Sequence, residues 1–182
     1  MLELVIIIVL LVLDQVSKYL VQLNLSPVGA SAPVIPGLLQ LTNVHNTGAA
    51  WGMMDGLRWF FIPMTLLVAA GLIYIIIRFR KKLTIFSRIT LALLFSGAVG
   101  NFIDRLFIGY VRDFFDITPL FSFPVFNVAD SALSIGCVLL VIDVLFLKDK
   151  SMFERISFQK AKPEQKSVDE SASSDASEHT DA

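Results

Sequence analysis

Four aspartates fall within a short stretch of this chain, and their number suggests acid–base chemistry. Carboxylates that lie close together in a medium of low dielectric raise one another's pKa, so a neighbouring pair can share one proton. Such a pair catalyses hydrolysis when its ionised member takes a proton from water and its protonated member polarises the carbonyl of the scissile bond. Arg105 and Arg112 could neutralise part of the negative charge. The residue types do not decide which two aspartates would pair, and a proton or cation pathway uses acids of the same kind. The four aspartates are Asp104, Asp113, Asp116 and Asp130.

Two further groups of polar residues fall in apolar surroundings. Asn101, Asp104 and Arg105 share one face of a helix by the 3.6-residue period, which indicates a polar face with something to hold. Asp14 and Lys18 are four residues apart, so they can pair on one helical face. This pair is either a local ion pair or part of a functional site, and both interpretations stay open.

Other kinds of catalytic site find little support. The only histidines are His45 and His179, so no His-rich metal site can form, and neither a metal nor another cofactor is expected. No Gly-x-Ser-x-Gly motif accompanies a possible serine nucleophile, and we interpret His45 as a polar strand residue. The single cysteine, Cys137, can form no intramolecular disulfide and is expected to fill the apolar interior.

The elements that must position these residues are membrane-spanning helices. Of the residues, 55% are hydrophobic and only 17% are charged, and the mean hydropathy is +0.70. Soluble domains carry about 25% charged residues, so a water-soluble fold is excluded. Gly97, Ala98 and Gly100 are expected to let another helix approach closely. Four apolar segments approach the length of about 20 residues that crosses a bilayer, namely residues 2–20, 59–77, 89–107 and 128–147.

The distribution of positive charge predicts the orientation of these spans. Arg78, Arg80, Lys81, Lys82 and Arg88 crowd the connection between the second and third spans, so that connection is predicted to be cytoplasmic. Both termini then lie in the cytoplasm, and the four aspartates lie at the outer face. The first span is expected to be retained rather than removed as a signal peptide, because no positive residue precedes its apolar run.

Two segments outside the spans are predicted to differ from the helices: one forms a β-strand and the other is disordered. Leu38 to Val44 follows Pro36-Gly37 and is typical of a β-strand, which predicts a small extracytoplasmic β element. Residues 154–182 are rich in Ser, Asp, Glu and Ala, so they are predicted to form a largely disordered cytoplasmic tail. The predicted fold class is an all-α integral membrane protein with four transmembrane helices, whose residues 1–153 form one domain.

Several short motifs resemble those of one known family. The order and membrane-compatible spacing of five blocks are specific to the bacterial lipoprotein signal peptidases, also called signal peptidase II. The resemblance covers about Leu11 to Ile142. The five blocks are Asp14-Gln15-x-x-Lys18, Asn46-Thr47-Gly48-Ala49-Ala50-Trp51, Gly100-Asn101-Phe102-Ile103-Asp104-Arg105, Val111-Arg112-Asp113-Phe114 and Phe126-Asn127-Val128-Ala129-Asp130.

The resemblance implies a membrane aspartyl endopeptidase with a catalytic dyad of Asp113 and Asp130. The implied substrate is a prolipoprotein whose cysteine after the cleavage site already carries a diacylglyceryl group, and the cut falls on the amino side of that cysteine. Asp116 has no counterpart in the motifs and is expected to be a solvated loop acid. The resemblance implies supporting or substrate-contacting roles for Asp14, Lys18, Asn46, Gly48, Asn101, Asp104, Arg105 and Asn127.

The same resemblance implies a place in the cell and a set of partners. The protein is expected in the bacterial cytoplasmic (inner) membrane as a monomer, with the lipid-modified prolipoprotein and membrane lipid as partners and with no nucleic acid. Two other functions, a proton-coupled membrane transporter and a non-catalytic assembly factor, are the alternatives that an acid cluster in a membrane protein allows.

Overall fold

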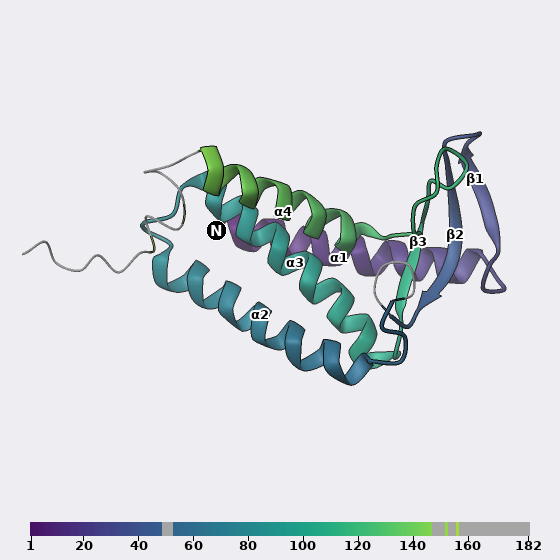
Figure 1. The fold of residues 1–182 in the computed structure, drawn as a ribbon, viewed down its shortest axis with the longest axis horizontal. Helices are drawn as coiled ribbons and strands as arrows, with labels where there is room; N and C mark the ends of the chain where they lie inside the picture. Colours follow the sequence, from purple (N-terminus) through teal and green to yellow (C-terminus); the bar gives the residue numbers. More distant parts are fainter. Residues whose placement is uncertain (49–52, 147–151, 153–155, 157–182) are drawn as a thin grey trace, which may run out of the picture.

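Four long helices form the body of the protein (Figure 1). The computed structural model describes residues 1–48, 53–146, 152 and 156. Each helix is long and apolar enough to cross a membrane, as the sequence predicted. The division into a domain of residues 1–153 and a tail stays a prediction, because residues 157–182 lie outside the described residues. The helices are α1 (Leu2–Asn24), α2 (Arg58–Phe79), α3 (Ile85–Phe107) and α4 (Val128–Phe146).

A small antiparallel sheet covers one end of the helices, and it completes the predicted fold class (Figure 1). Its strand order is β1 (Ser31–Ile35), β2 (Leu39–Asn46), β3 (Val111–Asp116). The strand predicted at Leu38 to Val44 is confirmed as β2, whereas β1 and β3 were not predicted. Helices α1 and α3 end beside the sheet, and α2 and α4 begin there. The sheet therefore lies where the helix ends bring their polar residues together.

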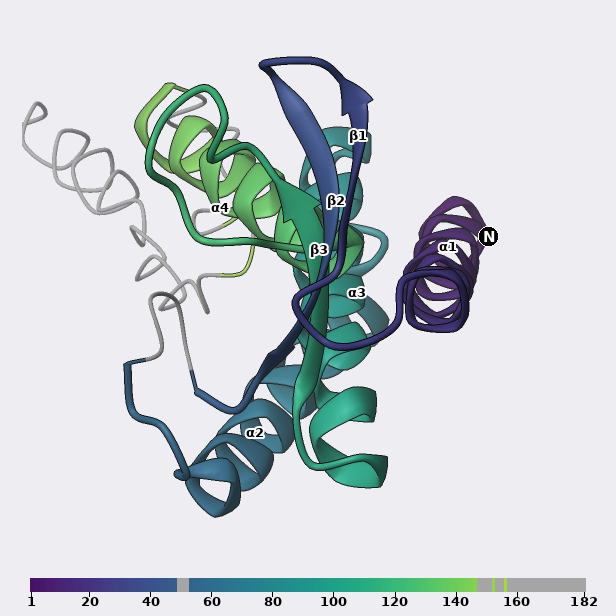
Figure 2. The same cartoon turned by 90° about the vertical axis from the view of Figure 1, so that its right-hand side faces the viewer.

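Helix α3 is the centre of the bundle. It packs against each of the other three helices, and Figure 2 shows it behind the sheet with those helices around it. A Cβ at Gly97 would lie 2.5 Å from the carbonyl oxygen of Ala129, and one at Gly100 would lie 2.8 Å from the Asp14 carboxylate. The predicted close approach is confirmed, since only glycine leaves room there for α4 and for the acid of α1.

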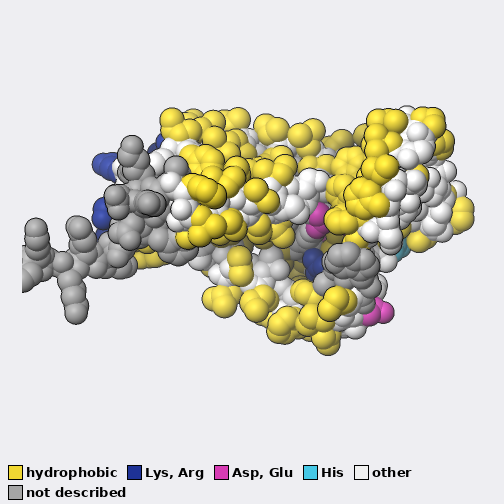
Figure 3. All heavy atoms as spheres, turned by 45° about the horizontal axis from the view of Figure 1, so that its top comes forward, with side chains coloured by type: hydrophobic (Ala, Val, Ile, Leu, Met, Phe, Trp, Pro, Cys, Tyr) yellow, Lys and Arg dark blue, Asp and Glu magenta, His cyan; other side chains and the backbone are white. Residues whose placement is uncertain are grey.

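The end of the bundle away from the sheet carries its own polar contacts. The buried carboxylate of Glu3 pairs with Arg80 and Arg88, and that of Asp143 accepts a hydrogen bond from Ser87 Oγ at 2.9 Å. Lys and Arg side chains gather at this end of the surface (Figure 3). Cys137 is exposed on α4, so the expectation that it fills the interior is wrong; a lipid-facing position serves an apolar thiol equally well.

Candidate active site

Asp113 is buried on β3 and is held by two amide side chains. Asn46 Nδ2, on the neighbouring strand β2, donates a hydrogen bond to Asp113 Oδ2 at 2.8 Å, and Asn127 Nδ2 donates to Asp113 Oδ1 at 2.6 Å. Burial is the main reason that the pKa of Asp113 is raised to about 7, and the negative charge of Asp130 adds to it. Asp113 can therefore gain or lose a proton near neutral pH.

Asp130 is fixed by its position in the first turn of α4. The Asp130 backbone N–H donates to Asn127 Oδ1 at 2.9 Å, and the Asn127 backbone N–H donates to Asp130 Oδ2 at 3.1 Å. These reciprocal bonds satisfy two backbone donors that the start of a helix leaves free. Asn101 Nδ2, on α3, donates to the other carboxylate oxygen at 2.6 Å. The start of α4 thus presents the Asp130 carboxylate in a defined orientation.

Asn127 connects the two acids directly. Its side chain donates to Asp113, while its backbone N–H and side-chain oxygen hold Asp130. Among the residues that the structure describes, neither Asp113 nor Asp130 forms an ion pair. We call these two acids the amide-held pair.

Lys18 is connected to this pair through Asn101, which also binds Asp130, and it has no exposed surface. Its ammonium group is 2.8 Å from Asp14 Oδ2 and 3.4 Å from Asp104 Oδ2, and it donates to Asn101 Oδ1 at 3.0 Å. Asp14 Oδ1 accepts a hydrogen bond from the backbone N–H of Ala129 at 2.9 Å. The predicted pairing of Asp14 with Lys18 is confirmed, and it is more than local, since it joins α1 to α3 and α4.

Asp104 has a second cationic partner on β3. Arg112 Nη2 donates to Asp104 Oδ1 at 2.7 Å, and Arg112 Nε donates to Asp104 Oδ2 at 3.2 Å, a bidentate arrangement that fixes both groups. Gln15 Oε1 accepts a further bond from Arg112 Nη2 at 2.9 Å. We call Asp14, Asp104, Lys18 and Arg112 the cation-held layer.

Arg105 reaches a different part of the site from its helical neighbours. Its Nη2 donates to the carbonyl oxygen of Gly48 at 2.8 Å, and its guanidinium lies over the ring of Phe61, 4.8 Å from the centroid. A Cβ at Gly48 would lie 2.5 Å from the carbonyl oxygen of Met53, so this turn requires glycine. Arg105 thereby holds Gly48 near Asn46, the residue whose amide binds Asp113.

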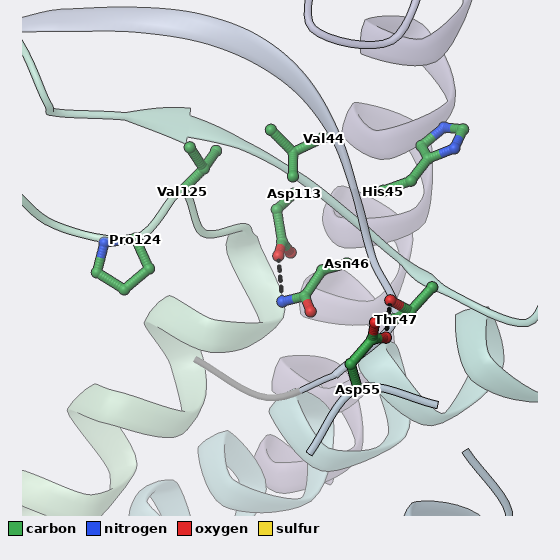
Figure 4. A pocket seen from close by; sticks show the side chains of 8 residues that line it. All are labelled: Val44, His45, Asn46, Thr47, Asp55, Asp113, Pro124 and Val125. Carbon is green, nitrogen blue, oxygen red and sulfur yellow. Dashed lines mark hydrogen bonds between the residues drawn. The ribbon is translucent and has the colours of Figure 1, made fainter. Parts of the chain in front are cut away.

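A pocket of about 250 Å³ opens beside Asp113 (Figure 4). Asp113 and Asn46 point toward each other in it, with Pro124 and Val125 on one side and the hydrogen-bonded Thr47 and Asp55 on another. The lining can therefore receive a peptide segment next to a titratable carboxylate. The complete lining is Val44, His45, Asn46, Thr47, Asp55, Asp113, Pro124 and Val125.

His45 contributes little to this chemistry. It belongs to β2, as predicted, but its ring points away from Asp113 and stacks on Tyr110 with 3.9 Å between the ring centroids. Burial, together with the charge of Arg112, lowers the pKa of His45, so the imidazole is neutral at pH 7.

Asp116 is not the solvated loop acid that was expected. It ends β3 and is only 4% exposed. Gln40, Thr42 and Thr118 donate to its two oxygens at 2.6 to 2.9 Å. Burial alone would raise its pKa, but these hydrogen bonds outweigh burial and lower the pKa of Asp116 to about 2. Asp116 is therefore a structural anion that joins β2 to β3.

Two residues of the site were not assigned a specific role from the sequence: Arg112, which lies on β3, and Gln15, which binds Arg112. Arg112 was seen only as a general counter-charge, and Gln15 was not singled out although it stands in the first motif. Alternation along a strand places Arg112 and Asp113 on opposite faces of the sheet, which could have been read from the pattern had the segment been predicted as a strand.

Comparisons with known proteins agree with this architecture. A family model described as signal peptidase (SPase) II matches residues 6–146. Lipoprotein signal peptidases of Staphylococcus aureus strains JH9 and Newman are 41% identical over 141 residues, which cover 77% of this chain and 84% of each relative.

Two solved structures of a bacterial membrane enzyme, determined in meso, have the same fold at 38% identity. One, at 2.3 Å resolution, has a TM-score of 0.72 and covers 82% of this chain and 89% of its own. The other, at 1.9 Å, has a TM-score of 0.70 and covers 79% and 92%. The matches in sequence and in structure extend over most of the chain, and the chain therefore belongs to the signal peptidase II family of aspartic peptidases.

Proposed function

We propose that this protein removes the signal peptide from diacylglyceryl-modified prolipoproteins and cleaves on the amino side of the lipidated cysteine. Family membership supports the removal of signal peptides from lipoproteins. The catalytic groups in this proposal are the two aspartates of the amide-held pair, Asp113 and Asp130. The other residues around them hold this pair in position or contact the substrate.

The observation that carries the proposal is the difference between the partners of the acids. Asp14 and Asp104 lie against the cations Lys18 and Arg112, which balance their negative charge in ion pairs. Asp113 and Asp130 instead accept hydrogen bonds from neutral amides and a backbone N–H. These donors orient the two carboxylates, while burial and the negative charge of Asp130 raise the pKa of Asp113, so the pair has the ability to exchange protons that a hydrolytic dyad needs.

The reaction follows from two acids that share one proton. The ionised member of the pair takes a proton from a water molecule, whose oxygen forms a bond to the scissile carbonyl carbon. The protonated member gives its proton to the carbonyl oxygen, which becomes a hydroxyl of the tetrahedral intermediate. When that intermediate collapses, the C–N bond breaks, the carboxyl group that took a proton from water gives it to the leaving amine, and the other carboxylate takes a hydroxyl proton as the carbonyl re-forms. The amine is the new amino terminus at the lipidated cysteine. The raised pKa of Asp113 suits an exchange of protons near neutral pH.

The placement in the membrane follows the same proposal. A substrate with acyl chains stays in the bilayer, since each buried methylene contributes about 0.8 kcal/mol, so its scissile bond must be met at the membrane surface. Arg80 and Lys81 follow the end of α2, in the connection to α3 that lies at the opposite end of the bundle from the site, which supports a cytoplasmic location for that end. The site then faces outward from the bacterial cytoplasmic membrane, both termini are cytoplasmic, and a monomer surrounded by lipid carries all the residues of the site.

Cleavage of a diacylglyceryl-modified prolipoprotein by the purified, detergent-solubilised protein tests the dyad. Asp113→Asn and Asp130→Asn should each lower kcat by at least about 100-fold, because each removes one partner of the acid–base chemistry. Asp116→Asn is the matched control: it changes a buried acid of the same strand as Asp113 and should retain cleavage.

Two comparisons make the outcome decisive. Each variant should elute from size exclusion as the wild type does and should unfold cooperatively at a temperature well above that of the assay, so that a loss of activity reports chemistry. Addition of a chelator should leave the wild-type rate unchanged. Normal cleavage by a folded Asp113→Asn or Asp130→Asn protein would remove that residue from the mechanism, and a chelator-sensitive rate would contradict the metal-free dyad.

A further inference from the structure

The part of the chain that builds the sheet is almost free of charge. Residues 19–54, which contain β1 and β2, include no Asp, Glu, Lys or Arg, and neither do residues 117–129, which follow β3. Surfaces that face water usually carry roughly 25–35% charged residues. A sheet that projected into water would be expected to show that composition, and this one does not.

The charged residues of β3 do not supply the missing surface charge. Arg112 is bound to Asp104, and Asp113 and Asp116 are buried and accept hydrogen bonds from amides and hydroxyls. Each charge of the sheet is therefore directed into the protein. What the sheet exposes is uncharged, and apart from polar side chains such as that of Ser31 it is largely apolar.

The exposed apolar side chains gather at two tips of the sheet region. The turn between β1 and β2 exposes Ile35 and Leu38. The segment after β3 exposes Leu120 and Phe121, which are 56% and 51% accessible. Both tips lie at the same end of the sheet (Figures 1 and 2), and in this region of the surface apolar side chains stand among uncharged atoms (Figure 3). Two segments that are distant in sequence thus form one apolar edge.

The second tip is an ordered structure. The rings of Phe121 and Phe123 are in edge contact with 6.1 Å between centroids, and Phe123 contacts Phe126 at 5.8 Å. Phe126 forms an isolated bridge with Phe115 of β3. This series of aromatic contacts fixes Phe121 in its exposed position on the sheet, although an unconstrained loop could have turned the ring inward.

We propose that the turn at Ile35–Leu38 and the segment at Leu120–Phe121 insert into the boundary between lipid headgroups and acyl chains. The segment leads directly through Phe126 into α4, a helix that spans the membrane, so the apolar edge continues a surface that already contacts lipid. Leu and Phe side chains are among those that surface elements bury at this boundary, and the lack of charge avoids the cost of bringing charged groups into it. The occupant of the edge is therefore membrane lipid.

Insertion of the two tips has a consequence for the site. Asn46 and Asp113 lie on β2 and β3, so a sheet held at the boundary holds their side chains at that depth as well. A scissile bond next to a lipidated residue is presented at the same depth. The inserted edge is in this way a positioning device for the whole sheet, and it is independent of which acid carries the proton.

Spin-label accessibility tests the insertion without any need for activity. In a Cys137→Ser background, nitroxide labels are attached to Leu38→Cys and Phe121→Cys, and the proteins are reconstituted into phospholipid nanodiscs. The reference sites are Lys81→Cys in the basic connection and Leu67→Cys, whose side chain is 72% exposed on the outer surface of α2. Collisions with molecular oxygen report lipid, and collisions with a neutral nickel chelate report water.

The ratio of oxygen to nickel accessibility at Leu38→Cys and Phe121→Cys should be several-fold higher than at Lys81→Cys and should approach the value at Leu67→Cys. A ratio equal to that of Lys81→Cys would place the edge in water and overturn the proposal. Labels that neither reagent reaches, together with dipolar broadening of the spectra, would assign the edge to a second copy of the chain and overturn it as well. All four positions are exposed, so labelling leaves the packed core intact.

Discussion

The cation-held layer and the amide-held pair show two ways of burying carboxylates within one site. Asp14 and Asp104 lie in contact with Lys18 and Arg112, with N–O distances from 2.7 to 3.4 Å. Asp113 and Asp130 are held at 2.6 to 3.1 Å by amide and backbone N–H groups. The distances are alike, but the charges of the partners differ.

This difference in partners separates the acids that support the site from the acids that can react. A buried cation lowers the free energy of the ionised acid, so the acid and the cation behave as a fixed ion pair that joins helices. A neutral amide offers hydrogen bonds but little charge, so burial and the neighbouring acid keep the proton exchangeable. The first arrangement suits the support of a site, and the second suits its reacting groups. The following predictions test this division.

Removal of the lysine should have the largest effect. Lys18→Met leaves Asp14 and Asp104 buried without one of their cations, and breaking a buried pair typically costs about 3–5 kcal/mol. We expect a large fall in the unfolding temperature in detergent and loss of cleavage. The double variant Lys18→Met/Asp14→Asn, which also removes the uncompensated acid, should recover part of the stability. A double variant less stable than Lys18→Met would contradict the assigned ion pair.

The amide-held pair should respond to pH. The pKa of Asp113 is about 7 in the folded protein and about 3.9 in an unfolded chain. Its contribution to stability is therefore complete below pH 4 and is lost as the pH rises to about 7, and the difference corresponds to at most about 4 kcal/mol. Thermal unfolding of the wild type and of Asp113→Asn measures this contribution. The wild type should lose stability relative to the variant between pH 4 and pH 8, and parallel curves would contradict the raised pKa.

The amide that connects the two acids should matter more for rate than for stability. Asn127→Ser keeps an oxygen that can cap α4 but removes the donor to Asp113. A hydrogen bond to a charged group is worth about 1.5–3 kcal/mol, so kcat should fall by about 10- to 100-fold. Asn43→Ser is the control: it removes a buried amide that binds the carbonyl oxygen of Leu25. Equal losses of kcat in both variants would mean that Asn127 acts only through folding.

Much of the helical framework could be predicted from the sequence, because a bilayer demands long apolar runs. The predicted limits were short where polar residues continue a helix. Helix α1 extends beyond residue 20 to Asn24, and α3 begins at Ile85 rather than at residue 89. Arg88 was counted in the basic connection outside the third span, yet it lies within α3, where it pairs with Glu3. An ion pair between distant segments is invisible to a pattern that considers one segment at a time.

The candidate site was predictable only where one helix contains both partners. The helical period alone gives the contact between Asp14 and Lys18. The different partners of Asp104 and Asp113 depend on β3, whose residues are buried on both faces and so show no simple alternation. Without that strand, the sequence left the choice among the four aspartates to a resemblance. The roles assigned to the supporting residues remain predictions that the variants above test.

Replacement of Asp116 should change stability less than Lys18→Met or Asp113→Asn, and its effect on stability should depend on pH in the opposite direction to that of Asp113→Asn. Its pKa of about 2 lies below that of an unfolded aspartate, so its contribution to stability is present above about pH 4 and is lost as the pH falls toward 2. Asp116→Asn exchanges an ionised acceptor of several hydrogen bonds for an amide and should cost at most about 2.6 kcal/mol at pH 7. Thermal unfolding should show the difference from the wild type shrinking as the pH falls, whereas the difference for Asp113→Asn grows as the pH rises. The two acids share strand β3 and both accept hydrogen bonds from neutral groups, so opposite slopes would reflect the stronger desolvation of Asp113 and the negative charge of Asp130 beside it. Slopes of the same sign would contradict that difference.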